Sequence, residues 1–399
     1  MFEPYLQHKE QRIEWLMIAA IAALAVIGAT FIYSATAANE SAKALAWYKQ
    51  EYFKQIIFYI IGFGLAAAVC LVEYNQIARW SLVGYWLSIL LLIAVFIVGT
   101  KVYGAQRWIK MGPFQFQPSE FAKLAFVIAM ANFLSRPADE LRLPGVFAKA
   151  LAMTVLPFAL ILKEPDLGSA LVLIPMTLGM MFVAGAPASY LRRLFICAGI
   201  VIALIIADVM FAPPQWRIPL ADYQRDRLLV YFGKDFAPRN ATPAELAQAR
   251  QRQQKKSYNI EQALISVGSG GLTGKGWRQG TQNALGYLPR AVAHNDFIFS
   301  VIAEEQGFLG SVTVLSLYTV ILFTGIRIAG QARDRLGRLL AVGIVAMLFS
   351  HVFINIGMNI RMMPVTGIPL PLLSYGGTSV ICSLVAVGIL HNIHIHHRS

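Results

Sequence analysis

Predominantly apolar stretches of about 17–22 residues recur along the 399-residue chain and limit its fold more than any other feature. A helix of about 20 residues rises about 30 Å, the thickness of the hydrocarbon core of a membrane. Composition agrees, because 57% of the residues are hydrophobic and 14% are charged, whereas an average soluble domain is about half apolar and a quarter charged. The sequence therefore predicts an all-α polytopic integral membrane protein with about ten transmembrane helices, at residues 15–35, 53–72, 80–99, 119–135, 146–162, 168–184, 192–211, 308–327, 339–357 and 372–391. The first stretch follows a polar start and is long enough to cross the membrane, so we expect a retained span and not a cleaved signal peptide.

Positive charges divide unevenly between the loops that join these stretches. With the N-terminus in the cytoplasm, the short inner loops and tails hold Lys9, Arg12, Arg79, Arg136, Arg142, Arg192, Arg193, Arg327, Arg333, Arg335, Arg338 and Arg398. The short outer loops then hold a smaller set, Lys43, Lys49, Lys101, Arg107, Lys110, Lys163 and Arg361. Inner loops of membrane proteins are enriched in Lys and Arg, so this asymmetry predicts that both termini are cytoplasmic. We therefore read the net charge of +13 as a membrane-topology signal and expect no nucleic-acid partner.

Residues 212–296 are predicted to form one large extracytoplasmic loop of about 85 residues between spans seven and eight, within a single membrane domain that covers 1–399. Thr242-Pro243-Ala244-Glu245 is typical of a capping box with proline at the first helical position. We expect a polar helix from there to about Lys256 and a separate, shorter amphipathic stretch at 260–267.

The end of this loop is expected to contain a further short helix. The span at 308–327 already crosses the membrane, so residues 297–306 are not needed for the crossing. We predict that they form a short helix that lies at the outer interface or dips into it. This placement keeps Glu304 and Glu305 out of the hydrocarbon centre, where a carboxylate costs several kcal/mol.

Ionisable side chains gather at the outer ends of the predicted helices. They are Arg107 and Lys110 before span four, Glu120 and Lys123 in its first turns, Lys163, Glu164 and Asp166 between spans five and six, and Asp296 at the end of the large loop. Glu120 and Lys123 are three residues apart and therefore share one face of a helix. Cations on the outer side oppose the general charge rule, and they favour an anionic ligand such as a phosphate.

Each of these residues also has a structural interpretation. Glu120 in a first helical turn complements the helix dipole, and the Lys123 side chain can extend to the lipid headgroups. Asp166 follows a proline and suits a turn, and Asp296 is a suitable N-cap for a helix beginning at Phe297. Convergence on one face of the bundle favours a functional site, because ionisable groups near a membrane interior usually mark one.

Three features that are typical of other functions have simpler explanations. The segment Gly268 to Lys275 resembles a phosphate-binding P-loop, but five residues separate Gly268 from Gly274, and Gly276 replaces the required Ser or Thr. A tail at the end of the last span is expected to be solvated and not a metal site, because it lacks an acidic or Cys neighbour: His391, His394, His396 and His397. The cysteines lie inside apolar stretches and are expected to be small core side chains: Cys70, Cys197 and Cys382.

The approach to the last span is rich in proline and glycine. Pro364, Gly367, Pro369 and Pro371 precede Ser374-Tyr375-Gly376-Gly377. Irregular backbone at membrane depth is tolerated where it is buried in protein or lines a wet cavity. This segment is therefore predicted to form a cavity wall near the outer face, with simple loop packing as the alternative.

A series of motifs runs in order from the third span to the end of the chain: Arg107-Trp108, Gln117-Pro118-Ser119-Glu120 with Lys123, Lys163-Glu164-Pro165-Asp166-Leu167-Gly168, Gly280-Thr281-Gln282, Asp296-Phe297-Ile298-Phe299 with Glu304-Glu305, Asn355-Ile356-Gly357-Met358, and Pro364 to Gly377. Together they resemble the SEDS family of peptidoglycan polymerases. The histidine-rich tail directly after the last span is more similar to the RodA-like elongation branch than to the FtsW division branch.

The resemblance implies a ten-helix glycosyltransferase that polymerises lipid II outside the bacterial cytoplasmic (inner) membrane for cell elongation and shape. It implies that Asp296 is essential for glycosyl transfer, and that Glu120, Lys123 and Asp166 line a polar cavity beneath it. The chemistry requires a base for the acceptor hydroxyl and cations for the diphosphate. We therefore assign Asp296 as the candidate base and, as candidate diphosphate partners, Arg107, Lys123 and Lys163, with Glu120 positioning Lys123.

The resemblance also implies partners: the nascent glycan strand, a class B penicillin-binding protein that acts as transpeptidase, and other membrane proteins of an elongation complex. The implied fold is metal-independent and no cofactor is evident, although a divalent cation could assist the leaving group. A flippase for lipid-linked cell-wall precursors is the main alternative function, and a non-catalytic scaffold is a third.

The chain departs from the family pattern at two places. The family usually has Leu-Pro-Glu followed closely by His-Thr-Asp, whereas here Arg290 follows Leu288-Pro289 and three residues precede His294-Asn295-Asp296. Arg361 stands where glycine is common. The aspartate is retained, and its immediate environment is expected to differ from that in the family.

Overall fold

Ten helices coincide with the ten predicted spans in a computed structural model that describes residues 13–37, 46–102, 105–112, 114–212, 216–218, 220, 222–234, 236, 242–289 and 292–396. They are α1 (Trp15–Ala37), α3 (Glu51–Cys70), α5 (Ser81–Val98), α6 (Pro118–Leu134), α8 (Pro144–Lys163), α9 (Leu167–Val183), α10 (Ala188–Phe211), α14 (Ile298–Gln331), α15 (Arg335–Asn359) and α16 (Gly377–Ile395). Eight of them are long and apolar enough to cross a membrane, whereas α6 and α9 have 17 residues each. The mostly helical class is confirmed, and the number of spans stays a prediction.

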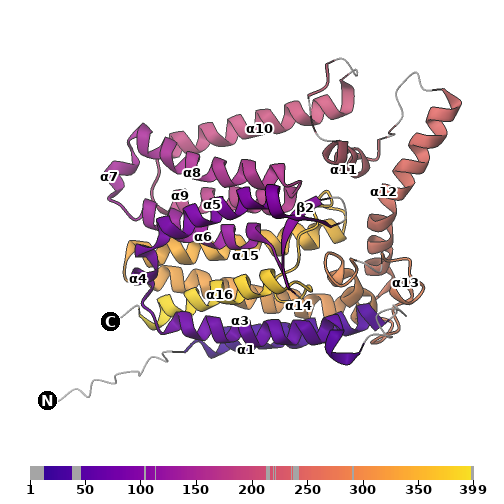
Figure 1. The fold of residues 1–399 in the computed structure, drawn as a ribbon, viewed down its shortest axis with the longest axis horizontal. Coiled ribbons are helices and arrows are strands. Elements are labelled where there is room, and N and C mark those ends of the chain that lie inside the picture. Colours follow the sequence, from indigo (N-terminus) through magenta and orange to yellow (C-terminus); the bar gives the residue numbers. More distant parts are fainter. Residues whose placement is uncertain are drawn as a thin grey trace.

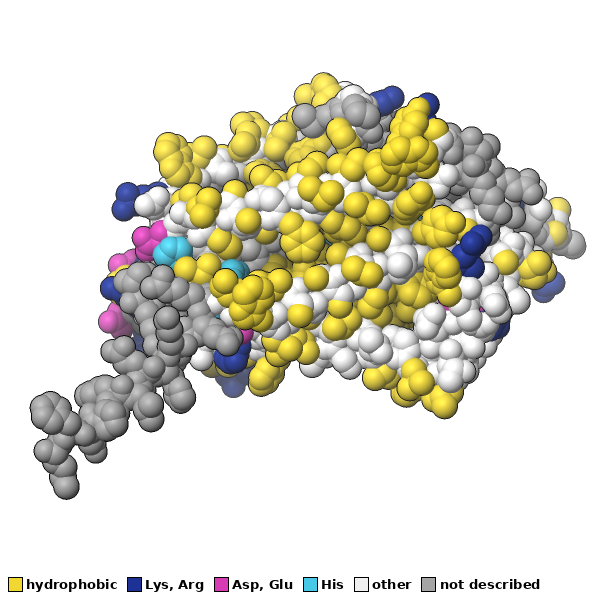
Figure 2. Space-filling model, turned by 90° about the horizontal axis from the view of Figure 1, so that it is seen from below, with side chains coloured by type: hydrophobic (Ala, Val, Ile, Leu, Met, Phe, Trp, Pro, Cys, Tyr) yellow, Lys and Arg dark blue, Asp and Glu magenta, His cyan; other side chains and the backbone are white. Residues whose placement is uncertain are grey.

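These helices pack side by side as a bundle (Figure 1). Helices α15 and α16 are the most buried of the candidate spans and α10 is the least. Hydrophobic side chains cover the flank of the bundle, while charged side chains gather at its two ends (Figure 2). A soluble protein buries most of its hydrophobic side chains. The exposed apolar flank of this bundle is therefore suited to contact with lipid.

The two ends of the bundle differ. The start of α1 and the end of α16 lie at one end, and three further helices lie at the other (Figure 1): α11 (Asp222–Phe232), α12 (Pro243–Ser269) and α13 (Thr281–Ala284). We call this second end the loop end. Shorter helices are found at η1 (Trp47–Lys49), α4 (Tyr74–Arg79) and α7 (Ala138–Leu141).

A three-stranded antiparallel sheet connects α5 to α6, and the sequence did not lead us to expect it. Its strands, in spatial order, are β1 (Thr100–Val102), β2 (Ala105–Met111) and β3 (Phe114–Phe116). Trp108 pairs with Thr100 on one side, and Ile109 pairs with Phe116 on the other. Aromatic and β-branched residues favour strands, and Gly112 supplies the positive φ of 62° at the turn between β2 and β3.

Two expectations are corrected, one for the large loop and one for the histidine tail at the end of α16. The polar helix and the amphipathic stretch are one continuous 27-residue helix, α12, since residues 257–259 contain neither glycine nor proline to separate them. Helix α12 packs on α14, and Ile260 and Ala263 in its second half are buried. The histidine tail does have an acidic neighbour, because Nε2 of His394 lies 3.3 Å from Oε1 of Glu14.

The predicted short helix before span eight is confirmed as the first part of α14. Gly307 interrupts this helix with a φ of 66° and a ψ of −157°. The glycine-rich segment at 268–276 packs into the break: the amide of Lys275 donates to the carbonyl of Glu304 (3.0 Å), and the amide of Phe308 donates to the carbonyl of Gly271 (2.8 Å). This segment therefore has a structural role at the kink.

Candidate active site

A cavity of about 490 Å³ opens at the loop end of the bundle. Residues from β2, β3, α3, α11 and the segment before α14 line it, together with Gly367, Tyr375 and Gly376 before α16 and Gly377 at its start. The polar and glycine residues of its wall are Glu51, Lys54, Arg107, Lys110, Gly112, Gln115, Arg227, Asn295, Asp296, Gly367, Tyr375, Gly376 and Gly377. The segment from Pro364 to Gly377 thus contributes to a cavity wall, as its proline and glycine content predicts.

Asp296 lies in this wall with its backbone firmly held. Its carbonyl accepts hydrogen bonds from Nδ2 of Asn355 and Nδ2 of Asn359, each 3.1 Å long, so α15 fixes its position. Helix α14 begins at Ile298 with Phe297 as its N-cap and no side-chain cap. The alternative in which Asp296 caps this helix is therefore wrong, and its carboxylate is left to face the cavity.

The surroundings of Asp296 make its carboxyl group unusually basic. Burial raises the pKa of Asp296 from 3.8 to about 6, and the carboxylate of Asp166 adds to this rise. The guanidinium groups of Arg107 and Arg227 oppose the shift. A carboxyl group with a pKa near 6 is mostly ionised at pH 7 and still basic enough to accept a proton, which is what a general base needs.

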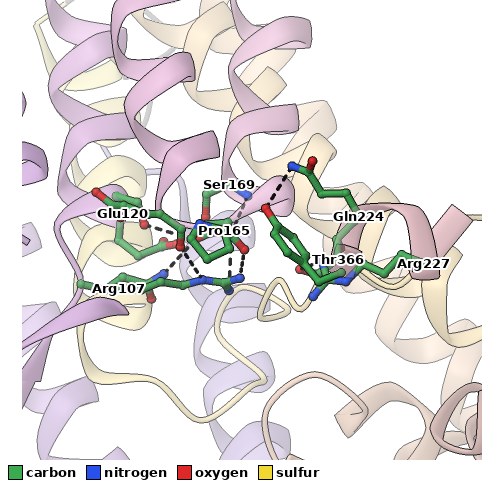
Figure 3. Close-up of polar contacts among 12 residues, drawn as sticks. Arg107, Glu120, Pro165, Ser169, Gln224, Arg227 and Thr366 are labelled. Atoms are coloured by element: carbon green, nitrogen blue, oxygen red, sulfur yellow. Dashed lines mark hydrogen bonds and ion pairs between the residues drawn. The ribbon is translucent and has the colours of Figure 1, made fainter. Parts of the chain in front are cut away.

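Arg107 joins the cavity to the turn between α8 and α9 (Figure 3). It donates from Nε to the carbonyl of Glu164 (3.2 Å) and from Nη2 to the carbonyl of Pro165. Its Nη1 lies 3.8 Å from Oδ1 of Asp166. The same carboxylate caps α9 by accepting a hydrogen bond from the amide of Ser169 (3.1 Å). Asp166 therefore has the structural role that its sequence position suggested. It contacts Arg107 of the cavity wall without lining the cavity itself, and its role in a functional site stays a prediction.

Glu164 in the same turn is buried, and neither of its carboxylate oxygens has a hydrogen-bond partner within the described part of the chain. Burial, together with the neighbouring carboxylate of Asp166, raises the pKa of Glu164 to about 9 against the opposing effect of Arg107. A buried carboxyl without a partner is most stable in its neutral form, so Glu164 is protonated at pH 7.

Glu120 and Lys123 of α6 form a buried cluster with His351 of α15. Nζ of Lys123 lies 2.7 Å from Oε1 of Glu120 and 2.6 Å from Nε2 of His351. Nδ1 of His351 lies 2.8 Å from the carbonyl of Met347, which can only accept, so we assign the proton to Nδ1 and the lone pair to Nε2. Lys123 then donates to both neighbours.

This cluster tests two expectations about α6. Lys123 is 0% exposed, so the alternative in which it extends to the lipid headgroups is wrong. The ion pair agrees with the expectation that Glu120 positions Lys123. Neither side chain is among the cavity-lining residues. The preceding residue, Ser119, has its Oγ 3.5 Å from Oδ2 of Asp166.

Lys163 is not brought to the cavity. Its side chain is exposed, and its Nζ lies 5.5 Å from the ring centroid of Phe96, outside the set of lining residues. Arg227 and Lys54 line the wall instead, and the sequence did not single them out. The sequence signal for Arg227 is the charged run Arg225-Asp226-Arg227, although charges in a long loop do not report topology.

Two departures from the family pattern have different outcomes. Arg290 lies outside the described residues. Arg361 adopts a φ of 60°, in the left-handed region that favours glycine. This positive φ explains why glycine is common at this position in the family, and it means that the backbone of Arg361 is strained.

Comparisons with known proteins agree with this architecture. The model of a cell cycle protein family that includes FtsW, RodA and SpoVE matches residues 14–399. The peptidoglycan glycosyltransferase MrdB of Escherichia coli (strain K12) is 37% identical over 321 residues, which is 80% of this chain and 79% of that protein. The peptidoglycan glycosyltransferase RodA of Treponema pallidum (strain Nichols) is 32% identical, in an alignment that covers 95% of this chain and 97% of that protein.

Solved structures show the same fold. A chain of a peptidoglycan synthase complex that coordinates polymerization and crosslinking has a TM-score of 0.76 at 26% identity, covering 97% of this chain and 99% of that one. The rod shape determining protein RodA of Thermus thermophilus has a TM-score of 0.65 at 27% identity, covering 97% of this chain and 98% of that one. The bundle, its cavity and these matches lead to one conclusion: this chain belongs to the SEDS family of FtsW, RodA and SpoVE.

Proposed function

We propose that this protein is a glycosyltransferase that polymerises peptidoglycan glycan strands from lipid II, with Asp296 as the general base. The observation that carries the proposal is a carboxylate with a raised pKa in a cavity lined by several cations. Relatives with this fold are named peptidoglycan glycosyltransferases, which supports the same activity.

The chemistry assigns a task to each kind of group in the cavity. Asp296 accepts the proton of the acceptor sugar hydroxyl, and the hydroxyl oxygen forms a new bond to the anomeric carbon of the donor sugar. The bond from that carbon to the lipid diphosphate breaks, and its electron pair leaves with the diphosphate. Cations stabilise the charge that develops there, and the lining offers Lys54, Arg107, Lys110 and Arg227. Assistance by a divalent cation stays a prediction.

The proposed location follows from the two ends of the bundle. The uneven charge distribution favours cytoplasmic termini. The cavity lies at the opposite end from the start of α1 and the end of α16, so it would face the outer side of the bacterial cytoplasmic membrane (Figure 1). A site there would meet lipid II after its transfer across the membrane, and the nascent strand would grow outside the cell.

The proposed partner is a class B penicillin-binding protein, together with other membrane proteins of an elongation complex. A structural neighbour of this chain is part of a peptidoglycan synthase complex that coordinates polymerization and crosslinking, which supports a transpeptidase partner. Cell elongation and shape are the proposed role, because the histidine-rich tail resembles the RodA-like branch and a structural neighbour is named a rod shape determining protein.

The test is a reconstitution of the purified protein with its transpeptidase partner. We expect glycan polymers from lipid II in a gel assay, and no rapid movement of fluorescent lipid II between the leaflets of vesicles. Scrambling of lipid II without polymer would contradict the proposal and favour a flippase. Neither polymer nor scrambling from a folded complex would favour a scaffold.

A further inference from the structure

An ion pair joins α10 to α11 beside the cavity. Oδ2 of Asp208, in the last turns of α10, lies 2.6 Å from Nη2 of Arg225, and Oδ1 of Asp208 accepts a hydrogen bond from the amide of Ile218 (2.9 Å). Both charged side chains are largely buried, with 6% and 12% of their surface exposed. A carboxylate in an apolar helix is destabilising unless a partner neutralises it, so the ion pair with Arg225 helps to stabilise Asp208 in α10.

Helix α11 presents two arginines in different directions. Residues two apart on a helix do not face each other, so Arg225 and Arg227 lie on different faces. Arg225 reaches Asp208, whereas Arg227 lines the cavity and donates from Nη1 to the carbonyl of Thr366 (3.4 Å) (Figure 3). Fixing α11 on its Arg225 face therefore determines where Arg227 points.

Other attachments of α11 are weaker. Asp226 pairs with Arg252 (2.8 Å) and Lys256 (3.9 Å) of α12, but these two cations are 54% and 51% exposed. Exposed ion pairs typically contribute little to stability, whereas breaking a buried pair is strongly destabilising. The hydroxyl of Tyr231 donates to the carbonyl of Met362 (3.1 Å), and this contact is exposed as well.

We propose that Asp208 is a positioning residue, which holds α11 through Arg225 so that Arg227 reaches the diphosphate of a lipid-linked sugar in the cavity beside Asp296. The inference rests on the proposed function for its substrate. It adds a structural dependence of the site on α10, the least buried candidate span of the bundle. Asp208 acts through another side chain and does not itself line the cavity.

The charge balance around Asp296 gives the proposal a specific signature. The charged groups that face Asp296 are Arg107 of β2, Arg227 of α11 and Asp166 of the turn between α8 and α9. On α3, Glu51 and Lys54 line the same cavity, and Glu51 lies 3.1 Å from His294 of Asp296's own segment. Moving Arg227 away removes one of the two cations that lower the pKa of Asp296, so the acid limb of the pH–rate profile should move to higher pH.

The experiment compares Asp208→Asn, Arg227→Gln and the double variant in the complex with the transpeptidase partner. A misplacement of about 1 Å costs up to roughly 100-fold in rate, so we expect Asp208→Asn to lose about tenfold to 100-fold in polymerisation. The acid limb of the pH–rate profile of Asp208→Asn should move to higher pH, as should that of Arg227→Gln. In the Arg227→Gln background, Asp208→Asn should add less than about twofold, because both changes remove the same interaction. Asp208→Glu, which keeps the carboxylate, should recover part of the rate.

Glu140→Gln is the matched control, because it breaks an exposed ion pair with Arg136 (3.3 Å) on the inner side of the predicted topology, and its rate should equal that of the unsubstituted protein. Binding of inorganic pyrophosphate, measured by calorimetry, is independent of polymerisation and should weaken roughly tenfold in Asp208→Asn and in Arg227→Gln.

Multiplied losses in the double variant, or an unshifted acid limb with unchanged pyrophosphate binding, would overturn the positioning role. If Asp208→Asn does not fold, the same measurements are made on Arg225→Lys. An unshifted acid limb of its pH–rate profile would likewise overturn the positioning role. If the unsubstituted protein binds pyrophosphate with this same dependence but makes no polymer, the proposed function fails and the positioning of an anion site by Asp208 remains.

Discussion

Asp296 has a fixed backbone and a basic side chain, and its pKa of about 6 leads to the first prediction. The base must be deprotonated to act, so the rate of polymerisation should rise with pH through about 6 and level off above it. Below that pH the rate should fall about tenfold per pH unit. Initial rates on lipid II between pH 5 and 8 measure this profile, and a rate that stays constant down to pH 5 would refute the base assignment.

Glu164 leads to a prediction about stability. Its pKa is about 9 in the folded protein and near 4.5 for an ordinary glutamate. Between these values the folded state holds a proton that the unfolded state releases, so this carboxyl destabilises the fold increasingly as pH rises. Glu164→Gln should match the unsubstituted protein near pH 5 and be more stable by roughly 1–3 kcal/mol at pH 8. Thermal unfolding in detergent at both values checks this, and a difference that does not depend on pH would contradict it.

Single residues also mark the limit of what the sequence predicted about the site. Asp296, Arg107 and Asp166 could be chosen in advance, because each stands next to a proline, an aromatic residue or a helix boundary in a recognisable motif. Arg227 was missed because its position beside Asp296 depends on how α11 folds back over the bundle. Lys163 is close in sequence to Asp166, yet the last turn of α8 directs its side chain to Phe96.

Among the elements, the kink in α14 depends on one glycine. A Cβ atom at Gly307 would lie 2.4 Å from the amide nitrogen of Gly274, and the φ of 66° is already unfavourable for other residues. Gly307→Ala should therefore destabilise the protein by at least about 1–3 kcal/mol. The substitution should also separate the glycine-rich segment at 268–276 from Glu304 and Glu305. Polymerisation should then be lost, because the chain that leads to Asp296 begins at this segment.

Gly330 provides the matched control in the same helix, because a Cβ atom there would have no neighbour within 4 Å. Gly330→Ala should be neutral or slightly stabilising, since alanine restricts the unfolded chain at no cost to the fold. Thermal unfolding of both variants is the measurement. Equal stability of Gly307→Ala and Gly330→Ala would mean that the kink is not a rigid feature.

Elements of different length were predictable to different degrees. Helices of about 20 apolar residues follow from hydropathy alone, and all ten were placed within a few residues, although α14 continues to Gln331. The strands β1 and β3 have three residues each, too short for any periodicity to be recognised. Helix α12 was divided in two because its composition changes from polar to amphipathic, whereas its backbone has no reason to break.

At the scale of the whole molecule, the bundle separates its chemistry by position. An apolar flank surrounds the helices, the ends of the chain lie on one side, and the cations of the cavity lie on the other (Figures 1 and 2). The buried cluster of Glu120, Lys123 and His351 lies between helices α6 and α15. A lipid-linked substrate could therefore keep its tail against the flank while its diphosphate meets the cavity.

The central claim is that Asp296 is the base of a peptidoglycan polymerase, and polymerisation of lipid II by Asp296→Asn tests it most directly. Asp139→Asn, an exposed carboxylate on α7, is the matched control. We predict that Asp296→Asn makes no polymer while it unfolds at the same temperature or higher, because the amide replaces a carboxylate that burial disfavours. Asp139→Asn should make polymer at the normal rate. Polymer at the normal rate from folded Asp296→Asn protein would contradict the account.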